Sequence, residues 1–162
     1  EKIQAAKQAL ENSSSSSAFI STAQLLADAD EVWKDYVKAG LITDHPTGDT
    51  GNNYSFSQCT WWVYIRRHQL GLTAGSLMGN GNQWANTARS LGYTVSNTPM
   101  VGDVMVFAAG QEGSDGYYGH VAIVEAITTD GSVITSECGA SRNGQPYSRV
   151  ISDPSRFEYI HY

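Results

Sequence analysis

The chain of 162 residues contains two cysteines, and one of them, Cys59, stands where a thiol can become a nucleophile. It lies at the start of residues 58–70, whose apolar side chains have helical spacing and which end at Gly71. A thiol at a helix N-terminus lies at the positive end of the helix dipole, beside unpaired backbone N–H groups, and both favour the thiolate. Since a lone cysteine is more often an inert buried side chain, a nucleophilic role requires a base elsewhere in the chain.

A histidine and a glutamate on two successive predicted strands can serve that thiol. His120 begins the first of these strands and Glu137 lies near the end of the second. If residues 128–131 form a four-residue loop between them, the two side chains are diagonal neighbours on one face, about 7–8 Å apart. A two-residue turn would move them out of reach. In the first register His120 acts as the base for Cys59 and Glu137 orients the imidazole, although each alone also fits a purely structural role.

The elements that must position these residues change character along the chain, from helical to strand-like periodicity. Helices followed by a run of strands are typical of an α+β domain with an antiparallel sheet, so this is the fold class we predict. The predicted helices are residues 2–11, 22–39, 58–70 and 82–91, and the predicted strands are residues 93–95, 103–108, 120–127, 132–138, 147–151 and 157–161.

The composition divides the chain near residue 40. Residues 13–17 are all serine, which predicts a flexible joint, and the segment before them is too short to bury much surface. Thr22 is the expected N-cap of the second helix. We therefore interpret residues 1–40 as a helical, serine-rich N-terminal extension or linker, and residues 41–162 as the main domain.

Charge and hydropathy exclude several classes of function. Ten basic residues stand against sixteen acidic ones, for a net charge of −6, and no basic patch for nucleic acid is visible. No apolar run reaches the roughly 18 residues of a membrane span. Because the first residue is Glu, we expect the chain to be a processed piece of a longer parent protein with other domains.

Five blocks of the sequence, in order, resemble the CHAP domain, the family of cysteine- and histidine-dependent amidohydrolases and peptidases found in bacterial and phage peptidoglycan hydrolases. The resemblance extends from about residue 52 to the end of the chain. The blocks are Tyr54 with Gln58-Cys59-Thr60-Trp61-Trp62-Val63, Gly81-Asn82 with Trp84-Ala85, Pro99 with Gly102-Asp103-Val104, Gly119-His120-Val121-Ala122-Ile123-Val124-Glu125, and Ser136-Glu137.

The resemblance implies a papain-like α+β fold, in which N-terminal helices precede an antiparallel sheet. It also implies Cys59 as the nucleophile, His120 as the base and Glu137 as the orienting acid. One departure lies beside the last of these. Members of the family often carry an asparagine two residues after the glutamate, and here that position is Gly139. A fourth polar member of the site is therefore missing or supplied from elsewhere.

A metal is not expected. Some members of the family bind calcium through acidic residues upstream of the cysteine, and this segment offers Asp44, Asp49, Asn52 and Asn53. Calcium requires six to eight oxygen ligands, and these four residues form no recognisable ligand pattern. The two cysteines cannot hold zinc unaided. We therefore expect neither a metal nor a cofactor.

Further residues are candidates for the oxyanion site and for substrate contacts. Tyr54 and Gln58 precede the nucleophile closely enough to assist its backbone N–H in binding an oxyanion. Trp61 on the same predicted helix, and Tyr118 in the glycine-rich loop before the histidine, are candidates for contacting substrate. Cys138 follows Glu137 on its strand, so it points to the opposite face and is expected to be a buried structural thiol.

The resemblance implies a secreted or cell-wall-associated enzyme that hydrolyses peptidoglycan through an acyl-enzyme on the cysteine. The bond is either the N-acetylmuramoyl-L-alanine amide or a peptide bond of the stem or cross-bridge. Two alternatives remain open: a degenerate wall-binding or scaffolding module, suggested by the missing asparagine, and a wall transpeptidase. A net charge of −6 gives no attraction to an anionic wall, so other domains are expected to provide targeting.

Overall fold

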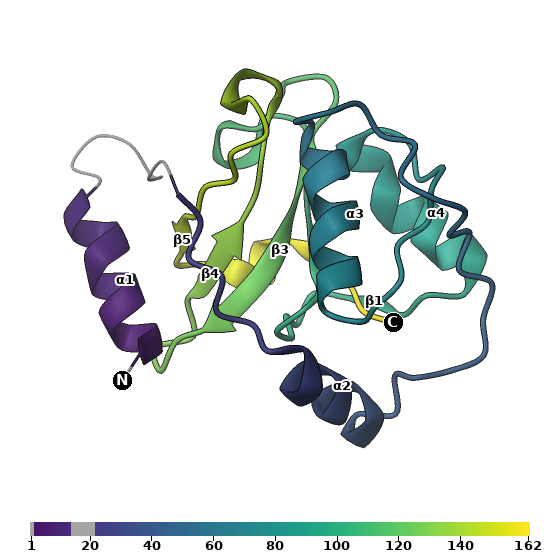
Figure 1. The fold of residues 1–162 in the computed structure, drawn as a ribbon, viewed down its shortest axis with the longest axis horizontal. Coiled ribbons are helices and arrows are strands. Elements are labelled where there is room, and N and C mark those ends of the chain that lie inside the picture. The colour runs from purple at the N-terminus through teal and green to yellow at the C-terminus, as the bar shows by residue number, and fades with distance from the viewer. Residues whose placement is uncertain (1, 14–21) are drawn as a thin grey trace.

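The computed structural model describes residues 2–13 and 22–162 (Figure 1). Most of the predicted serine joint, residues 14–17, lies outside the described residues. Within the described ranges, four α-helices come first and six short strands follow, which confirms the α+β fold class. The helices are α1 (Lys2–Ser13), α2 (Ala29–Lys38), α3 (Cys59–Gln69) and α4 (Trp84–Leu91), and the strands are β1 (Val95–Ser96), β2 (Val104–Phe107), β3 (His120–Ile127), β4 (Val133–Ser136), β5 (Val150–Ile151) and β6 (Glu158–Ile160).

The six strands form one antiparallel sheet in the order β1-β6-β2-β3-β4-β5. Helix α3 packs along β3 on one face of the sheet, and α4 lies beside it (Figure 1). The largest core cluster fills this interface, with Trp84, Val63 and Ile123 at its centre. A second cluster, which includes Phe107 and Val124, belongs to the opposite face. No helix in the described part of the chain is long and apolar enough to cross a membrane.

The hairpin between β3 and β4 differs from the expected register at its turn. Ile127 lies opposite Val133 rather than Ser132, a shift of one residue. A β-bulge at Glu125 then takes up the extra residue on β3, so that Val124 and Ile123 pair with Thr135 and Ser136 as expected. The loop prediction was therefore wrong near the turn, while the expected register is present beyond the bulge, at Val124 and Ile123.

Helix α2 begins at Ala29, and its N-cap is Asp28 rather than the expected Thr22. The reason lies in the bulged residue of β3. The backbone N–H of Leu26 and that of the next residue both donate to Oε1 of Glu125, at 2.9 and 3.0 Å. These donors are bound to a side chain rather than arranged for a helix, so residues 23–28 form a non-helical strap across the sheet (Figure 1).

Both N-terminal helices pack on the domain. Val32 and Tyr36 of α2 are buried in the largest core cluster. Helix α1 buries Ala6 and Leu10 against a small cluster on β3 and β4. The expectation that the segment before the serine run is too short to bury surface was therefore wrong. The division at residue 40 stays a prediction.

Candidate active site

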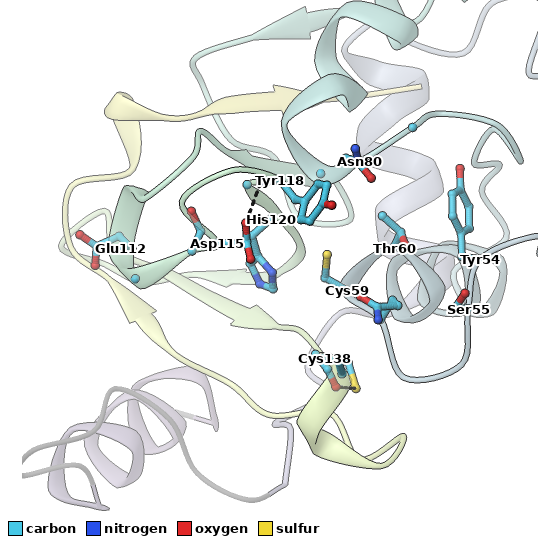
Figure 2. A pocket seen from close by; sticks show the side chains of 18 of the residues that line it. Tyr54, Ser55, Cys59, Thr60, Asn80, Glu112, Asp115, Tyr118, His120 and Cys138 are labelled. Carbon is cyan, nitrogen blue, oxygen red and sulfur yellow. Dashed lines mark hydrogen bonds between the residues drawn. The ribbon is translucent and has the colours of Figure 1, made fainter.

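Cys59 is the first residue of α3, at the edge of a groove of about 580 Å³. The groove is also lined by the loops around Asn80 and Asp115 and by the chain after β4, around Gly139. Figure 2 shows the Cys59 side chain and the His120 ring facing each other across it. The N-cap residue of α3, Gln58, makes no side-chain cap hydrogen bond. The Gln58 side chain therefore does not cap the backbone N–H groups of the first turn, which lie beside the thiol.

The expected contact between the histidine and the glutamate is present. His120 Nε2 lies 2.7 Å from Glu137 Oε1, which leaves Nδ1 for the thiol of Cys59. Glu137 has no exposed surface, and its backbone pairs with Tyr147 across the end of the sheet. The bulge at Glu125 produces this contact, because it restores the diagonal relation between the two side chains. Their catalytic roles stay predictions.

The protonation states of the pair favour a nucleophile. Burial raises the pKa of Cys59, but the hydrogen bond and charge of His120 and the backbone N–H groups of Val121 and Thr60 outweigh it, so the net pKa is lowered. Burial lowers the pKa of His120, but its bonds to Cys59 and Glu137 raise it to about 9. The lowered pKa of the thiol and the raised pKa of the imidazole both favour a thiolate–imidazolium pair over the two neutral groups.

Several neighbouring side chains form hydrogen bonds or salt bridges with the carboxylate of Glu137. Thr135 donates its hydroxyl to Oε2, and Arg149 forms a salt bridge with both oxygens. Burial raises the pKa of Glu137, but the charges of Arg149 and His120 lower it to about 2. Arg149 was missed by the sequence analysis, since no motif includes it. The available signal was a single arginine inside a predicted strand.

Ser57, two residues before the nucleophile, was also missed. It is buried and has a φ of +72°, in the left-handed region that non-glycine residues rarely adopt. Its hydroxyl donates to the carbonyl of Gly139 at 2.7 Å and accepts the N–H of Gly144 at 2.8 Å. These bonds tie the turn that precedes Cys59 to the loop that follows Glu137. A serine within a polar turn carries no sequence signal for such a distant bond.

The other candidates for oxyanion and substrate contacts differ in their position relative to the groove. Tyr118 and Gln58 line the groove, and Tyr118 is half-exposed. Tyr54 also lines it, but its hydroxyl donates to the carbonyl of Gly75 and points away from the thiol (Figure 2), so the structure does not support an oxyanion role. Trp61 is not among the residues that line the groove and packs instead against the exposed ring of Phe56.

Two further positions bear on the departures from the family pattern. Gly139 has extended backbone, and a Cβ there would meet no side chain or backbone closer than 4.0 Å, so space does not exclude an asparagine. Asp49, one of the oxygen donors upstream of the cysteine, accepts hydrogen bonds from Tyr64 and His68. Within the described residues, no three His, Cys, Asp or Glu side chains converge to hold a metal. Cys138 is a free, fully buried thiol.

Replacing Glu137 should weaken the site in graded fashion. We expect Glu137→Gln to keep partial activity, because the amide still accepts a hydrogen bond from His120, and Glu137→Ala to keep less. The bond to Cys59 and the bond and charge of Glu137 together raise the pKa of His120 to about 9, and both changes remove that charge, so the alkaline limit of activity should move to lower pH. The measurement is the rate of substrate turnover against pH. A fully active Glu137→Ala enzyme would remove Glu137 from the site.

Comparison with known proteins decides the family. The model of the CHAP domain matches residues 49–139, more than half of the chain, and this segment contains the thiol, the imidazole and the carboxylate. The chain belongs to the CHAP domain family. Its papain-like α+β class, inferred from the sequence blocks, is thereby confirmed.

Relatives of this CHAP domain come from Staphylococcus aureus. The probable autolysin LDP is 39% identical over 111 residues, 68% of this chain and 38% of the relative, and the secretory antigen SsaA is 42% identical over 113 residues, 68% and 41%. A crystal structure of an N-acetylmuramoyl-L-alanine amidase from that organism aligns with a TM-score of 0.65 at 37% identity, over 70% of this chain and 33% of that one. The chain thus spans well under half the length of these proteins.

Proposed function

We propose that this CHAP domain hydrolyses an amide bond of peptidoglycan through a thiolate on Cys59 and an acyl-enzyme. The observation that carries the proposal is the arrangement of a thiol at a helix N-terminus facing an imidazole that a buried glutamate holds, at the edge of an open groove. The names of the relatives, an autolysin and an amidase, support peptidoglycan as the substrate and partner.

The chemistry follows from the positions of the groups. The Cys59 thiolate attacks the carbonyl carbon, and the negative charge that develops on oxygen is stabilised by backbone N–H groups of the first turn of α3, with Gln58 as a further donor. His120 gives its proton to the leaving nitrogen, and the C–N bond breaks to leave a thioester. A water molecule then loses a proton to His120 and attacks the thioester, which releases a carboxylic acid and restores the thiolate.

The bond that is cut is proposed more narrowly as the N-acetylmuramoyl-L-alanine amide, with a stem or cross-bridge peptide bond as the alternative. The support is the name of the solved relative that shares 37% identity with this chain. The names of relatives, a secretory antigen and an autolysin, also support a secreted or wall-associated location. With a net charge of −6, attachment to an anionic wall is assigned to other domains of a longer protein.

Digestion of purified walls tests this proposal. Wild type should reduce the turbidity of a wall suspension and release fragments, while Cys59→Ala should do neither and should remain folded. Mass spectrometry of the fragments then identifies the bond by the new ends. Binding to walls without release of fragments would favour the scaffolding module, and new cross-links in place of new free ends would favour a transpeptidase.

A further inference from the structure

Arg149 is a buried arginine whose guanidinium group forms a salt bridge with Glu137, a residue of the candidate active site. It is only 7% exposed. Its Nε donates to Oε2 of Glu137 at 3.0 Å, and one terminal nitrogen donates to Oε1 at 2.8 Å. Such a two-point salt bridge fixes the plane of the carboxylate as well as its charge. Oε1 is the same oxygen that contacts His120.

The remaining contacts of Arg149 connect this pair to the groove. Its other terminal nitrogen donates to the backbone carbonyl of Glu112 at 2.7 Å, in the loop that forms one wall. Its guanidinium carbon lies 5.1 Å from the centre of the Phe107 ring, and that ring packs edge-on against His120 at 5.1 Å. One side chain thus contacts the glutamate, the support of the histidine and the groove wall.

A buried carboxylate needs such a partner to stay ionised. Without a compensating charge, a carboxyl group in an apolar environment takes up a proton. The groups that face Glu137 are His120, Arg149, Tyr147 and the hydroxyl of Thr135, with Cys59 beyond the histidine. Of these only Arg149 carries a charge that does not titrate near neutral pH. The charge of His120 is not an independent replacement, because it is itself coupled to the ionisation of Cys59 and Glu137.

We propose that Arg149 is a positioning residue that keeps Glu137 ionised and oriented, and thereby maintains the thiolate–imidazolium pair of Cys59 and His120. The proposal deepens the proposed hydrolase function. Its primary test, however, follows the reactivity of the thiol and requires no substrate, so that its failure is distinct from a failure of the hydrolase assignment.

The test is the rate of iodoacetamide labelling of Cys59 against pH, resolved by peptide mapping. In Arg149→Met the carboxyl of Glu137 should take up a proton at a higher pH, His120 should lose its proton at a lower pH, and the thiol should need a higher pH to ionise. We expect the midpoint of labelling to rise by at least about one pH unit, which is roughly a tenfold slower reaction at pH 6. Arg149→Lys, which keeps the charge, should move the midpoint back toward wild type.

Matched controls separate this role from a structural one. Arg156→Met removes another arginine that binds Glu112, this time through its carboxylate at 3.0 Å, and does not contact Glu137. It should label as wild type does. Glu137→Gln combined with Arg149→Met removes both charges of the buried pair, so no unpaired charge is left to destabilise the fold. If Arg149 acts through Glu137, this double variant should label no more slowly than Glu137→Gln alone.

Each outcome decides for or against the proposal. Thermal unfolding is measured first, and Arg149→Gln replaces Arg149→Met if the latter does not fold. Three results would overturn the proposal. They are a wild-type labelling midpoint in Arg149→Met, an equal shift of that midpoint in Arg156→Met, and slower labelling of the double variant than of Glu137→Gln. With walls as substrate, we expect the neutral variant to lose more activity at pH 5.5 than at pH 8, and Arg149→Lys to recover part of the difference. A loss equal at all pH values would indicate a structural role only.

Discussion

Replacing Cys59 by serine, or His120 by alanine, is expected to lower the rate of wall hydrolysis by at least about 10³-fold. A serine hydroxyl stays protonated where the thiol is ionised, and without the imidazole neither the thiolate nor the proton for the leaving nitrogen is supplied. The fold should persist, because neither side chain fills the centre of the core. The rate is measured as loss of turbidity, with thermal unfolding recorded for each variant.

The double variant and a second serine substitution serve as controls. Since the two groups act as one unit, Cys59→Ser with His120→Ala should be no worse than either single change. Cys138→Ser makes the same chemical change at the other cysteine, whose sulfur lies 3.6 Å from the hydroxyl of Ser57, and should keep most of the activity. Strictly additive losses would contradict a shared mechanism.

Removing residues 1–40 should abolish stable folding of the remaining chain. This deletion takes Val32 and Tyr36 out of the largest core cluster, and loss of a large buried side chain costs about 2–5 kcal/mol. It also removes the hydroxyl that donates to buried Asp103 at 2.5 Å and the two N–H groups bound to Glu125. Total stabilities are about 5–15 kcal/mol, so these losses together approach the whole. The measurement is thermal unfolding followed by circular dichroism.

Two smaller changes in the same segment should destabilise the protein less than the deletion of residues 1–40. Deleting residues 1–17 removes only α1, with buried Ala6 and Leu10, and should lower the melting temperature by several degrees while the domain stays folded. Tyr36→Ala should be far more destabilising than Tyr36→Phe, which keeps the ring and loses only the hydroxyl's bonds to Asp103 and Arg67. A cooperative transition for residues 41–162 at an unchanged temperature would show that the boundary at residue 40 marks an independent domain.

The sequence predicts the parts of the site that lie on regular elements. Cys59 follows from the start of a helix, and the pairing of His120 with Glu137 follows from strand alternation. The sequence pattern did not predict how that pairing arises. The register at the turn differs by one residue from the predicted register, and the bulge at Glu125 compensates for this difference. Local patterns thus placed the three residues without revealing how the hairpin brings two of them together.

The rest of the site depends on contacts between distant segments, which periodicity does not report. Arg149 binds Glu137 from the segment that precedes β5, and Ser57 binds the loop at Gly139. The late start of α2 has the same origin, because a carboxylate from β3 binds the backbone of residues 26 and 27. In each case a polar side chain satisfies a partner that lies far away in sequence.

Labelling of the wild-type thiols with iodoacetamide against pH tests the central claim most directly. Cys59 should react with a pKa below the ordinary value of about 8.5 and ahead of Cys138 at pH 7, because His120 and the first turn of α3 favour its thiolate. In His120→Ala the titration should move toward the ordinary value, and low-pH labelling that persisted there would assign the shift to the helix terminus alone. A wild-type Cys59 that titrates near 8.5, or a Cys138 that labels first, would contradict the assignment of Cys59 as the activated nucleophile.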